Sequence, residues 1–171
     1  GSYSIDDEEL SLFYNLYNKW VFEESNTVHL TEKHKDVAPI LIDLDLRHNN
    51  NDQKRHYTSE FIVKFIEYYV QEIKKLIPNV LDNNLVAFVL EKKKPNYQCG
   101  KGVFKDGIHI LFPYIITEPK VQYLLRYNSI ANENILNLFS SINAVNEPDD
   151  IFDIAVIEKN NWQMYGSTKP H

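Results

Sequence analysis

Apolar residues recur along the chain with two different periods, which predict a mixture of helices and strands. Spacings of three and four residues favour helices, whereas short apolar runs with period two favour strands. The helical spacing covers residues 5–23, residues 58–77 behind the capping candidates Thr58 and Ser59, a stretch opened by Pro119, and a piece around Leu138. The strand-like runs are residues 39–46, 85–90, 107–112 and 151–157.

From residue 39 onward the expected order is strand, helix, strand, strand, helix, strand. This order is typical of the split βαβ fold, which is also called ferredoxin-like or RRM-like. Such an α+β domain has both helices on one face of an antiparallel sheet and leaves the other face open. We therefore expect residues 39–171 to form the core, residues 3–38 to be a helical extension of the same domain, and residues 1–2 to be a tag remnant.

The period of two assigns polar residues to the open face. On the first strand, Asp43 and Asp45 point away from the apolar set Ile40, Ile42, Leu44 and Leu46. On the third strand Gly107 and His109 point away from Ile108, Ile110 and Phe112, and on the fourth Asp153 points away from Phe152, Ile154 and Val156. In the expected topology the first strand lies between the third and the fourth, so these polar residues converge on one surface.

Carboxylates at positions i and i+2 of a strand lie on one side, with Cα atoms roughly 6.5–7 Å apart. With Asp153 added, Asp43 and Asp45 would offer the hard oxygen ligands that Mg²⁺ or Mn²⁺ prefers. Two such ions support phosphoryl or nucleotidyl transfer. Each residue also has an ordinary interpretation: the aspartates as exposed strand residues, Asp153 as a turn or capping residue, and His109 as a hydrogen-bonded histidine.

Composition and charge narrow the choice of partners. The net charge of −6 argues against binding nucleic acid through the overall field, although five lysines lie within residues 92–105. Cys99 is the only cysteine, which excludes an internal disulfide and a multi-cysteine zinc site and favours a reducing, intracellular compartment. No apolar run approaches the roughly 20 residues of a membrane span, so we expect no membrane partner.

Three motifs together resemble the archaeo-eukaryotic primase superfamily. They are "ILIDLDL" (40–46), "KDGIHILFP" (105–113) and "FDIAVIEKNNWQMYGSTKP" (152–170), in the order and spacing of that superfamily. The likeness is greatest to the primase domain of the primase–helicase proteins of poxviruses and giant DNA viruses. It implies that Asp43, Asp45 and Asp153 are catalytic, metal-binding acids for two Mg²⁺ or Mn²⁺ ions. It further implies a nucleotide-binding set: Gly107, His109, Lys101, Lys105, Ser167 and Lys169.

The sequence departs from the superfamily pattern at two positions. Gly107 stands where many relatives have Ser, and Gln163 stands where relatives usually have Arg. An Arg-to-Gln exchange removes a cation and a fork of donors, which weakens contacts to phosphate. The resemblance also implies a helicase domain elsewhere in the same polypeptide and, for a viral protein, a replication site in the host cytoplasm.

The leading hypothesis is therefore a primase-type nucleotidyltransferase that makes primers on single-stranded DNA from NTPs or dNTPs. One alternative is a catalytically weak, primase-like module that only binds single-stranded nucleic acid, as RRM-type sheets do. Another is a metal-dependent nuclease or phosphoesterase that uses the same carboxylates.

Overall fold

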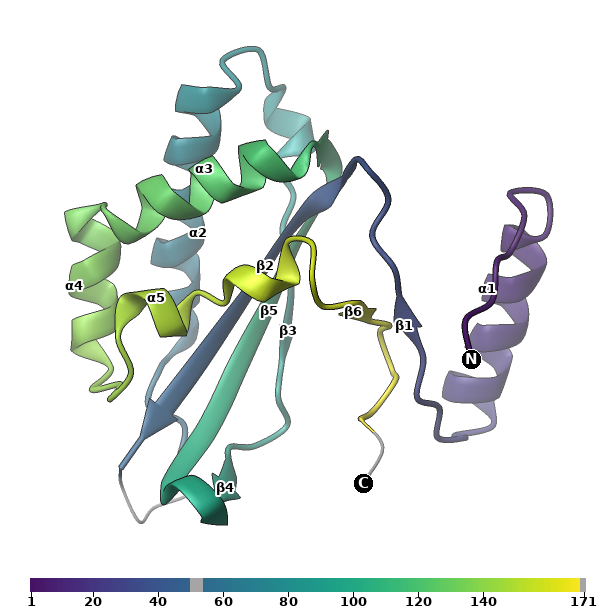
Figure 1. The fold of residues 1–171 in the computed structure, drawn as a ribbon, viewed down its shortest axis with the longest axis horizontal. Coiled ribbons are helices and arrows are strands. Elements are labelled where there is room, and N and C mark those ends of the chain that lie inside the picture. Colours follow the sequence, from purple (N-terminus) through teal and green to yellow (C-terminus); the bar gives the residue numbers. More distant parts are fainter. Residues whose placement is uncertain (50–53, 170–171) are drawn as a thin grey trace. The chain divides into compact units, whose positions relative to one another are not determined.

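The computed structural model describes residues 1–49 and 54–169 and has an α+β fold with antiparallel sheets. The chain divides into two units, one made of residues 34–160 and the other of residues 1–33 together with residues 161–171. The larger unit contains the main sheet and the helices that pack on it (Figure 1). The assignment of residues 3–38 and 39–171 to one domain stays a prediction.

The main sheet is built around two long strands, β2 (Ala38–His48) and β5 (Val103–Thr117). Its order is β2-β5-β3, with β3 at Phe88–Glu91, and the short strand β4 (Asn96–Gln98) also pairs with β5. Every pairing is antiparallel. The prediction that the first and third expected strands are neighbours is confirmed.

Strand β5 is much longer than the predicted run of residues 107–112, and Pro113 does not end it. The register changes from Ile40 opposite Phe112 to Pro39 opposite Ile116, so residues 113–115 fall in an irregularity of the ladder. A proline lacks the N–H that a regular ladder needs, and an irregularity of this kind accommodates it without a lost bond.

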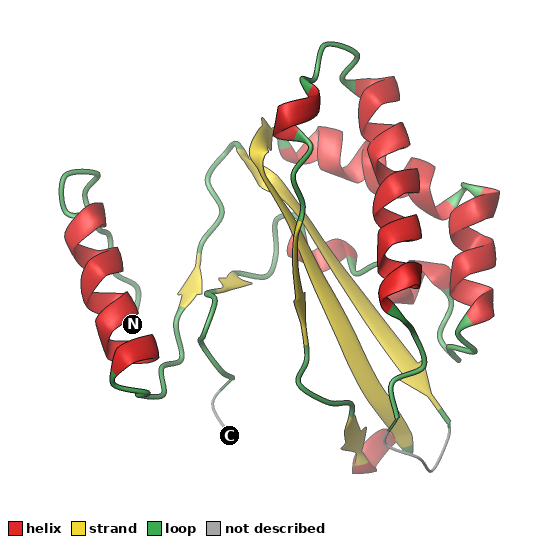
Figure 2. Ribbon diagram, turned by 180° about the vertical axis from the view of Figure 1, so that it is seen from behind, coloured by secondary structure: helices red, strands yellow, loops and turns green. Residues whose placement is uncertain are grey.

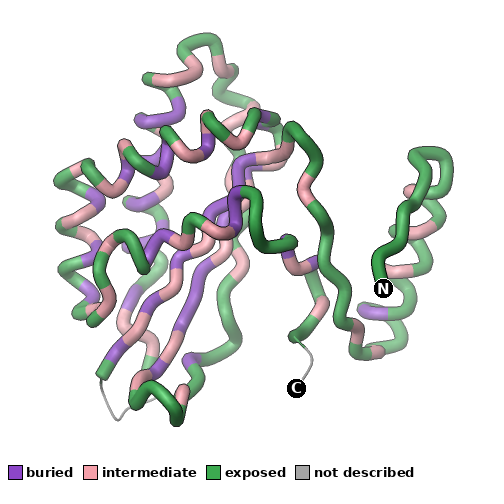
Figure 3. Tube along the Cα trace, viewed as in Figure 1, coloured by how far each residue is buried: buried purple, intermediate pink, exposed green. Residues whose placement is uncertain are grey.

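The three longest helices of the larger unit lie together on one side of the sheet (Figures 1 and 2). They are α2 (Ser59–Leu76), α3 (Pro119–Ile130) and α4 (Glu133–Ser141), close to the predicted positions. As predicted, Thr58 caps α2, because its side chain accepts a hydrogen bond from the Phe61 N–H. The apolar positions of β2 and β5 face these helices, and Ile40, Ile42, Leu44, Leu46, Ile108, Ile110 and Phe112 are all 0% exposed. Buried and half-buried residues alternate along these strands (Figure 3).

The predicted fourth strand at residues 151–157 is wrong. The chain forms the short helix α5 (Pro148–Ile151), makes a single bridge between Phe152 and Leu44, and then turns into a 3-10 helix, Ile154–Val156. Local chemistry explains the difference: Pro148 stands in the first turn of α5, and the Asp153 side chain caps the 3-10 helix. Because the strand period is broken, Ile154 is 44% exposed and does not share a buried face with Phe152.

The smaller unit contains the helix α1 (Leu10–Asn18), which continues as a π-helical turn over Lys19–Glu23. The prediction of a helix in residues 5–23 is therefore confirmed from Leu10 onward. A two-stranded ladder joins β1 (Thr31–Glu32) to β6 (Trp162–Gln163). In the described parts of the chain, no helix combines the length and the apolar character that crossing a bilayer requires.

Candidate metal centre

The ladder between β2 and β5 sets the positions of the polar residues on the open face. Asp43 is the direct partner of His109, and Asp45 is the direct partner of Gly107. Cross-strand partners project to the same face, and the buried apolar residues that alternate with them fix which face this is. Asp43, Asp45 and His109 are accordingly half-buried rather than enclosed in the core.

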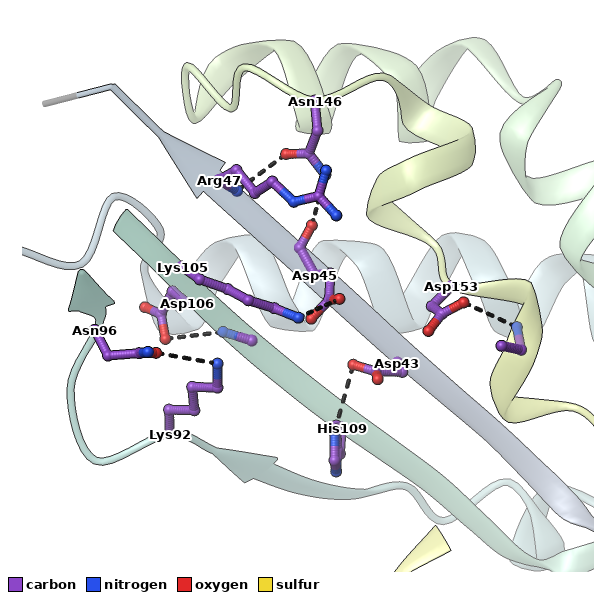
Figure 4. A network of polar contacts seen from close by, with 12 residues as sticks. Asp43, Asp45, Arg47, Lys92, Asn96, Lys105, Asp106, His109, Asn146 and Asp153 are labelled. Atoms are coloured by element: carbon purple, nitrogen blue, oxygen red, sulfur yellow. Dashed lines mark hydrogen bonds and ion pairs between the residues drawn. The ribbon is translucent and has the colours of Figure 1, made fainter. Parts of the chain in front are cut away.

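Asp153 joins this group from the other edge of β2. Its backbone N–H donates to the Asp43 carbonyl at 2.9 Å, next to the bridge between Phe152 and Leu44. As a result Asp43, Asp45 and Asp153 each offer a carboxylate oxygen, and these oxygens all lie within 4.8 Å of one another (Figure 4). The convergence predicted from strand alternation is present, although a bridge and a cap position Asp153 instead of a strand.

The donor set fits a hard divalent cation. The Oδ1 atom of Asp43 is buried and makes no hydrogen bond within the described structure, and His109 Nε2 lies 3.4 Å from it. A buried carboxylate oxygen without a hydrogen bond is costly, and a bound cation would remove that cost. All three acids supply oxygen, which Mg²⁺ and Mn²⁺ prefer.

The carboxylates of Asp45 and Asp153 have partners within the protein. Lys105 Nζ lies 2.5 Å from Asp45 Oδ2, and Asp153 Oδ1 accepts a hydrogen bond from the Ala155 N–H at 2.8 Å. The side chains of Lys105 and Asp45 are 21% and 16% exposed. The ion pair is thus partly shielded from solvent, and its attraction is screened less than that of a surface pair.

Asn146 supports the site, and the sequence analysis did not find it. Its Nδ2 donates to the Asp45 carbonyl at 2.8 Å, and its Oδ1 accepts from the Arg47 N–H at 3.0 Å. The adjacent Val145 N–H donates to the Arg47 carbonyl at 2.8 Å. A side-chain amide therefore takes the place of a strand backbone at this edge of β2. An isolated Asn in a loop carries no periodicity, so only the fold reveals this role.

A second network supports the site from β5. Arg55 Nε donates to the buried Asp106 carboxylate at 3.0 Å, and Arg55 also bonds to Glu91 at 2.7 Å and to the Lys92 carbonyl. Asp106 in turn accepts from the Gly107 N–H at 2.9 Å. These contacts fix the backbone beside Asp45. The sequence analysis did not assign Arg55 a role.

Gly107 forms the floor of the site beside Asp45. A Cβ atom built on it would lie 3.5 Å from the Leu44 carbonyl oxygen and from Lys92 Cε, and 3.8 Å from Asp45 Oδ1. These are ordinary van der Waals distances, so a serine at this position would fit without displacing the backbone.

Three predicted nucleotide-binding residues are not among the side chains described above: Lys101, Ser167 and Lys169. Lys101 is exposed in the 3-10 helix Cys99–Lys101, before β5 begins. Ser167 and Lys169 belong to the smaller unit. The Ser167 hydroxyl accepts from the Leu30 N–H at 2.6 Å and donates to the Val28 carbonyl at 3.1 Å. Gln163, the departure noted above, donates to the Ser167 carbonyl at 2.7 Å and so stabilises this turn. The roles of Lys101, Ser167 and Lys169 in nucleotide binding stay predictions.

Comparison with known proteins identifies the family of this chain. The whole chain, residues 1–171, matches the family described as "C962R protein N-terminal AEP domain". The chain belongs to this AEP domain family. AEP denotes the archaeo-eukaryotic primases, so the resemblance inferred from the three motifs is confirmed at the level of the family.

Relatives of this AEP domain come from large DNA viruses. Protein L207/L206 of Acanthamoeba polyphaga mimivirus, named as a candidate helicase, is 36% identical over 169 residues, which cover 99% of this chain and 17% of that protein. Protein 121R of Invertebrate iridescent virus 3, also named as a candidate helicase, is 28% identical over 185 residues, which cover 99% of this chain and 19% of that protein. The AEP domain described here thus spans less than a fifth of the length of these relatives.

Proposed function

We propose that this AEP domain is a primase-type, template-directed nucleotidyltransferase that synthesises primers on single-stranded DNA for viral replication. The observation that carries the proposal is the group of Asp43, Asp45 and Asp153, whose carboxylate oxygens lie within 4.8 Å of one another on the open face. Membership of the AEP family supports the same reaction class.

The topology also supports a primase core. The succession β2, α2, β3, β5 and α3, with Phe152 bridged to β2, follows the chain order of a split βαβ fold. We propose that the domain is a variant of this fold in which one bridge replaces the last strand. The open face then remains accessible to template and nucleotide.

The three acids have one shared role in this proposal. Asp43, Asp45 and Asp153 would hold two Mg²⁺ or Mn²⁺ ions, which when bound lower the pKa of the primer 3′-hydroxyl and neutralise the departing pyrophosphate. The backbone contacts of Asn146 and Asp153 with β2 keep the carboxylates in place before substrate arrives. Such preorganisation avoids the free-energy cost of rearranging the carboxylates during the reaction.

Two neighbouring side chains would bind the nucleotide. His109 lies beside Asp43 with 35% of its side chain exposed, so its ring can donate to a phosphate or sugar oxygen. Lys105 lies beside Asp45 and can neutralise part of the triphosphate charge. The helicase names of the viral relatives support a helicase partner in the full-length protein.

Primer synthesis on a single-stranded template tests the proposal directly. The wild-type protein should join labelled NTPs or dNTPs into oligonucleotides in the presence of Mn²⁺ or Mg²⁺, and EDTA should abolish the product. Asp43→Asn and Asp45→Asn should each lower synthesis by at least roughly a hundredfold, because each removes an anionic ligand. The matched control is Asp150→Asn, which removes an exposed carboxylate near Asp153.

The same reactions separate the proposal from its rivals. Template degradation that depends on Asp43 and Asp45, without synthesis, would show a nuclease instead. Tight, metal-independent binding of the template with no product would show a binding module. Either result would overturn the nucleotidyltransferase assignment.

A further inference from the structure

Lys105 forms an ion pair with an oxygen of Asp45 that a bound cation would also use. It projects from β5, where it is the direct partner of Arg47, one step along the same face from Gly107 and its partner Asp45. Its ammonium lies 2.5 Å from Asp45 Oδ2, whereas the carboxylate oxygens of Asp43 and Asp153 lie within 4.8 Å of an Asp45 oxygen (Figure 4). The lysine is therefore an internal counter-charge for a group of three acids.

Electrostatics makes this counter-charge important. Three carboxylates so close together repel one another, and the repulsion is screened little at the partly buried Asp45. An ammonium offsets part of the repulsion in the protein without metal. A divalent cation that approached Asp45 would instead meet the positive charge of Lys105, and each cation would weaken the binding of the other.

No bulky side chain of β5 adjoins Lys105 on its face, and the group that approaches Gly107 there is the flexible end of Lys92, whose Cε would lie 3.5 Å from a Cβ built on Gly107. On β5 the next residue on the same face is Gly107, which has no side chain, and His109 follows it. No β5 side chain therefore stands between Lys105 and His109 on this face. The lysine head carries three donors on a flexible four-carbon stem, so it can exchange one oxygen partner for another at little cost.

We propose that Lys105 acts as a stand-in for the second metal ion and leaves Asp45 when a nucleoside triphosphate binds. This inference rests on the proposed function and deepens it. The phosphate oxygens give the ammonium a competing anionic partner, which frees Asp45 to ligate the cation that arrives with the nucleotide. Binding of the cation and binding of the nucleotide are thereby coupled, and the coupling is reciprocal.

Mn²⁺ binding to the nucleotide-free protein tests this role without relying on activity. Free Mn²⁺ would be measured by electron paramagnetic resonance for the wild type, Lys105→Met and the control Lys64→Met. The control removes the same charge from an exposed lysine of α2, on the helix-covered side of the sheet. Lys105→Met should bind Mn²⁺ at least about tenfold more tightly than the wild type, because a unit positive charge near the acids is gone. Lys64→Met should change the affinity by less than about twofold.

A second titration measures the coupling. With a non-hydrolysable α,β-imido nucleoside triphosphate present, the Mn²⁺ affinity of the wild type should rise at least about tenfold, and this gain should be mostly lost in Lys105→Met. Lys105→Gln provides a second variant that keeps a polar end, and thermal melting shows whether both variants fold.

The failures can be told apart. If Asp45→Asn weakens Mn²⁺ binding but Lys105→Met and Lys105→Gln do not strengthen it, the stand-in role is overturned and the metal centre remains. If substitution of Asp43, Asp45 and Asp153 leaves Mn²⁺ binding unchanged, the proposed function itself fails, and the stand-in role fails with it.

Discussion

His109 Nε2 lies 3.4 Å from Asp43 Oδ1, and the two residues are direct partners across the β2–β5 ladder. This relationship follows from packing. The alternate residues Leu44 and Ile108 are 0% exposed, so a slip of one residue would turn an apolar set toward solvent and is strongly opposed. The core therefore fixes the register, and the register brings the imidazole to the carboxylate.

Asp153 has a structural role that can be separated from its proposed chemistry. Asp153→Ala removes the side-chain acceptor for the Ala155 N–H and should lower the free energy of unfolding by about 0.5–2 kcal/mol. Asp153→Asn keeps an oxygen acceptor and should unfold near the wild-type denaturant concentration, yet it should lose primer synthesis as Asp43→Asn does. Equal activity of Asp153→Asn and the wild type would exclude Asp153 from the metal centre.

Two glycines should respond differently when each is replaced by serine. Gly107→Ser should fold with wild-type stability, because a Cβ there finds contacts of 3.5 Å or more, and it should lower KM for nucleotide by adding a hydroxyl donor. Gly166→Ser is the contrast. Gly166 has φ +83, and its Cβ would lie 2.7 Å from Phe22 Cζ. It should lose more than about 1 kcal/mol of stability in chemical denaturation. Comparable destabilisation of both variants would contradict the packing around Gly107.

Asn146 should stabilise the fold through its hydrogen bonds to the edge of β2. Asn146→Ala removes hydrogen bonds to the Asp45 carbonyl and the Arg47 N–H, and it should lower the free energy of unfolding by about 1–3 kcal/mol. Amide hydrogen exchange provides the local measurement: the Arg47 amide should lose protection while the core amide of Ile42 keeps it. Unchanged protection of Arg47 would show that the Asn146 contact does not hold the strand edge.

The buried side chain of Tyr69 should make the free energy of unfolding fall at high pH. The side chain is 1% exposed, and burial raises its pKa above the ordinary value of 10.0. Above pH 10 the unfolded chain releases the phenol proton while the folded chain retains it. The stabilising contribution is thus complete below that pH and declines as pH rises. Between pH 8 and pH 11, Tyr69→Phe should lose about 1.4 kcal/mol less stability than the wild type. Identical losses in urea titrations at both pH values would contradict this.

Much of the larger unit was predictable because its elements follow strong local patterns. Strand alternation assigned Ile42 and Asp43 to opposite faces, and Thr58 marked the start of α2. Both features depend on residues close in sequence, and the buried Ile42 and the hydrogen bond of the Thr58 cap confirm them. Alternation and topology assigned Asp43 and Asp45 to the open face correctly, and Asp153 joins them although the strand predicted around it does not form.

The sequence analysis missed one competing local signal and two contacts between distant residues. Around Asp153, apolar alternation favoured a strand, but Pro148 and the aspartate cap favoured short helical turns, and local capping prevailed. The amide of Asn146 completes β2 from about a hundred residues away, and Arg55 reaches Asp106 from a polar loop. Neither contact leaves a periodic trace in the sequence.

The most direct test of the account is a crystal of the protein soaked with Mn²⁺ and a nucleoside triphosphate, measured at a wavelength where manganese scatters anomalously. The account predicts anomalous peaks between Asp43, Asp45 and Asp153, at roughly 2.0–2.2 Å from their carboxylate oxygens, as expected for a hard octahedral cation. Nucleotide bound elsewhere, with no manganese at these three carboxylates, would contradict it.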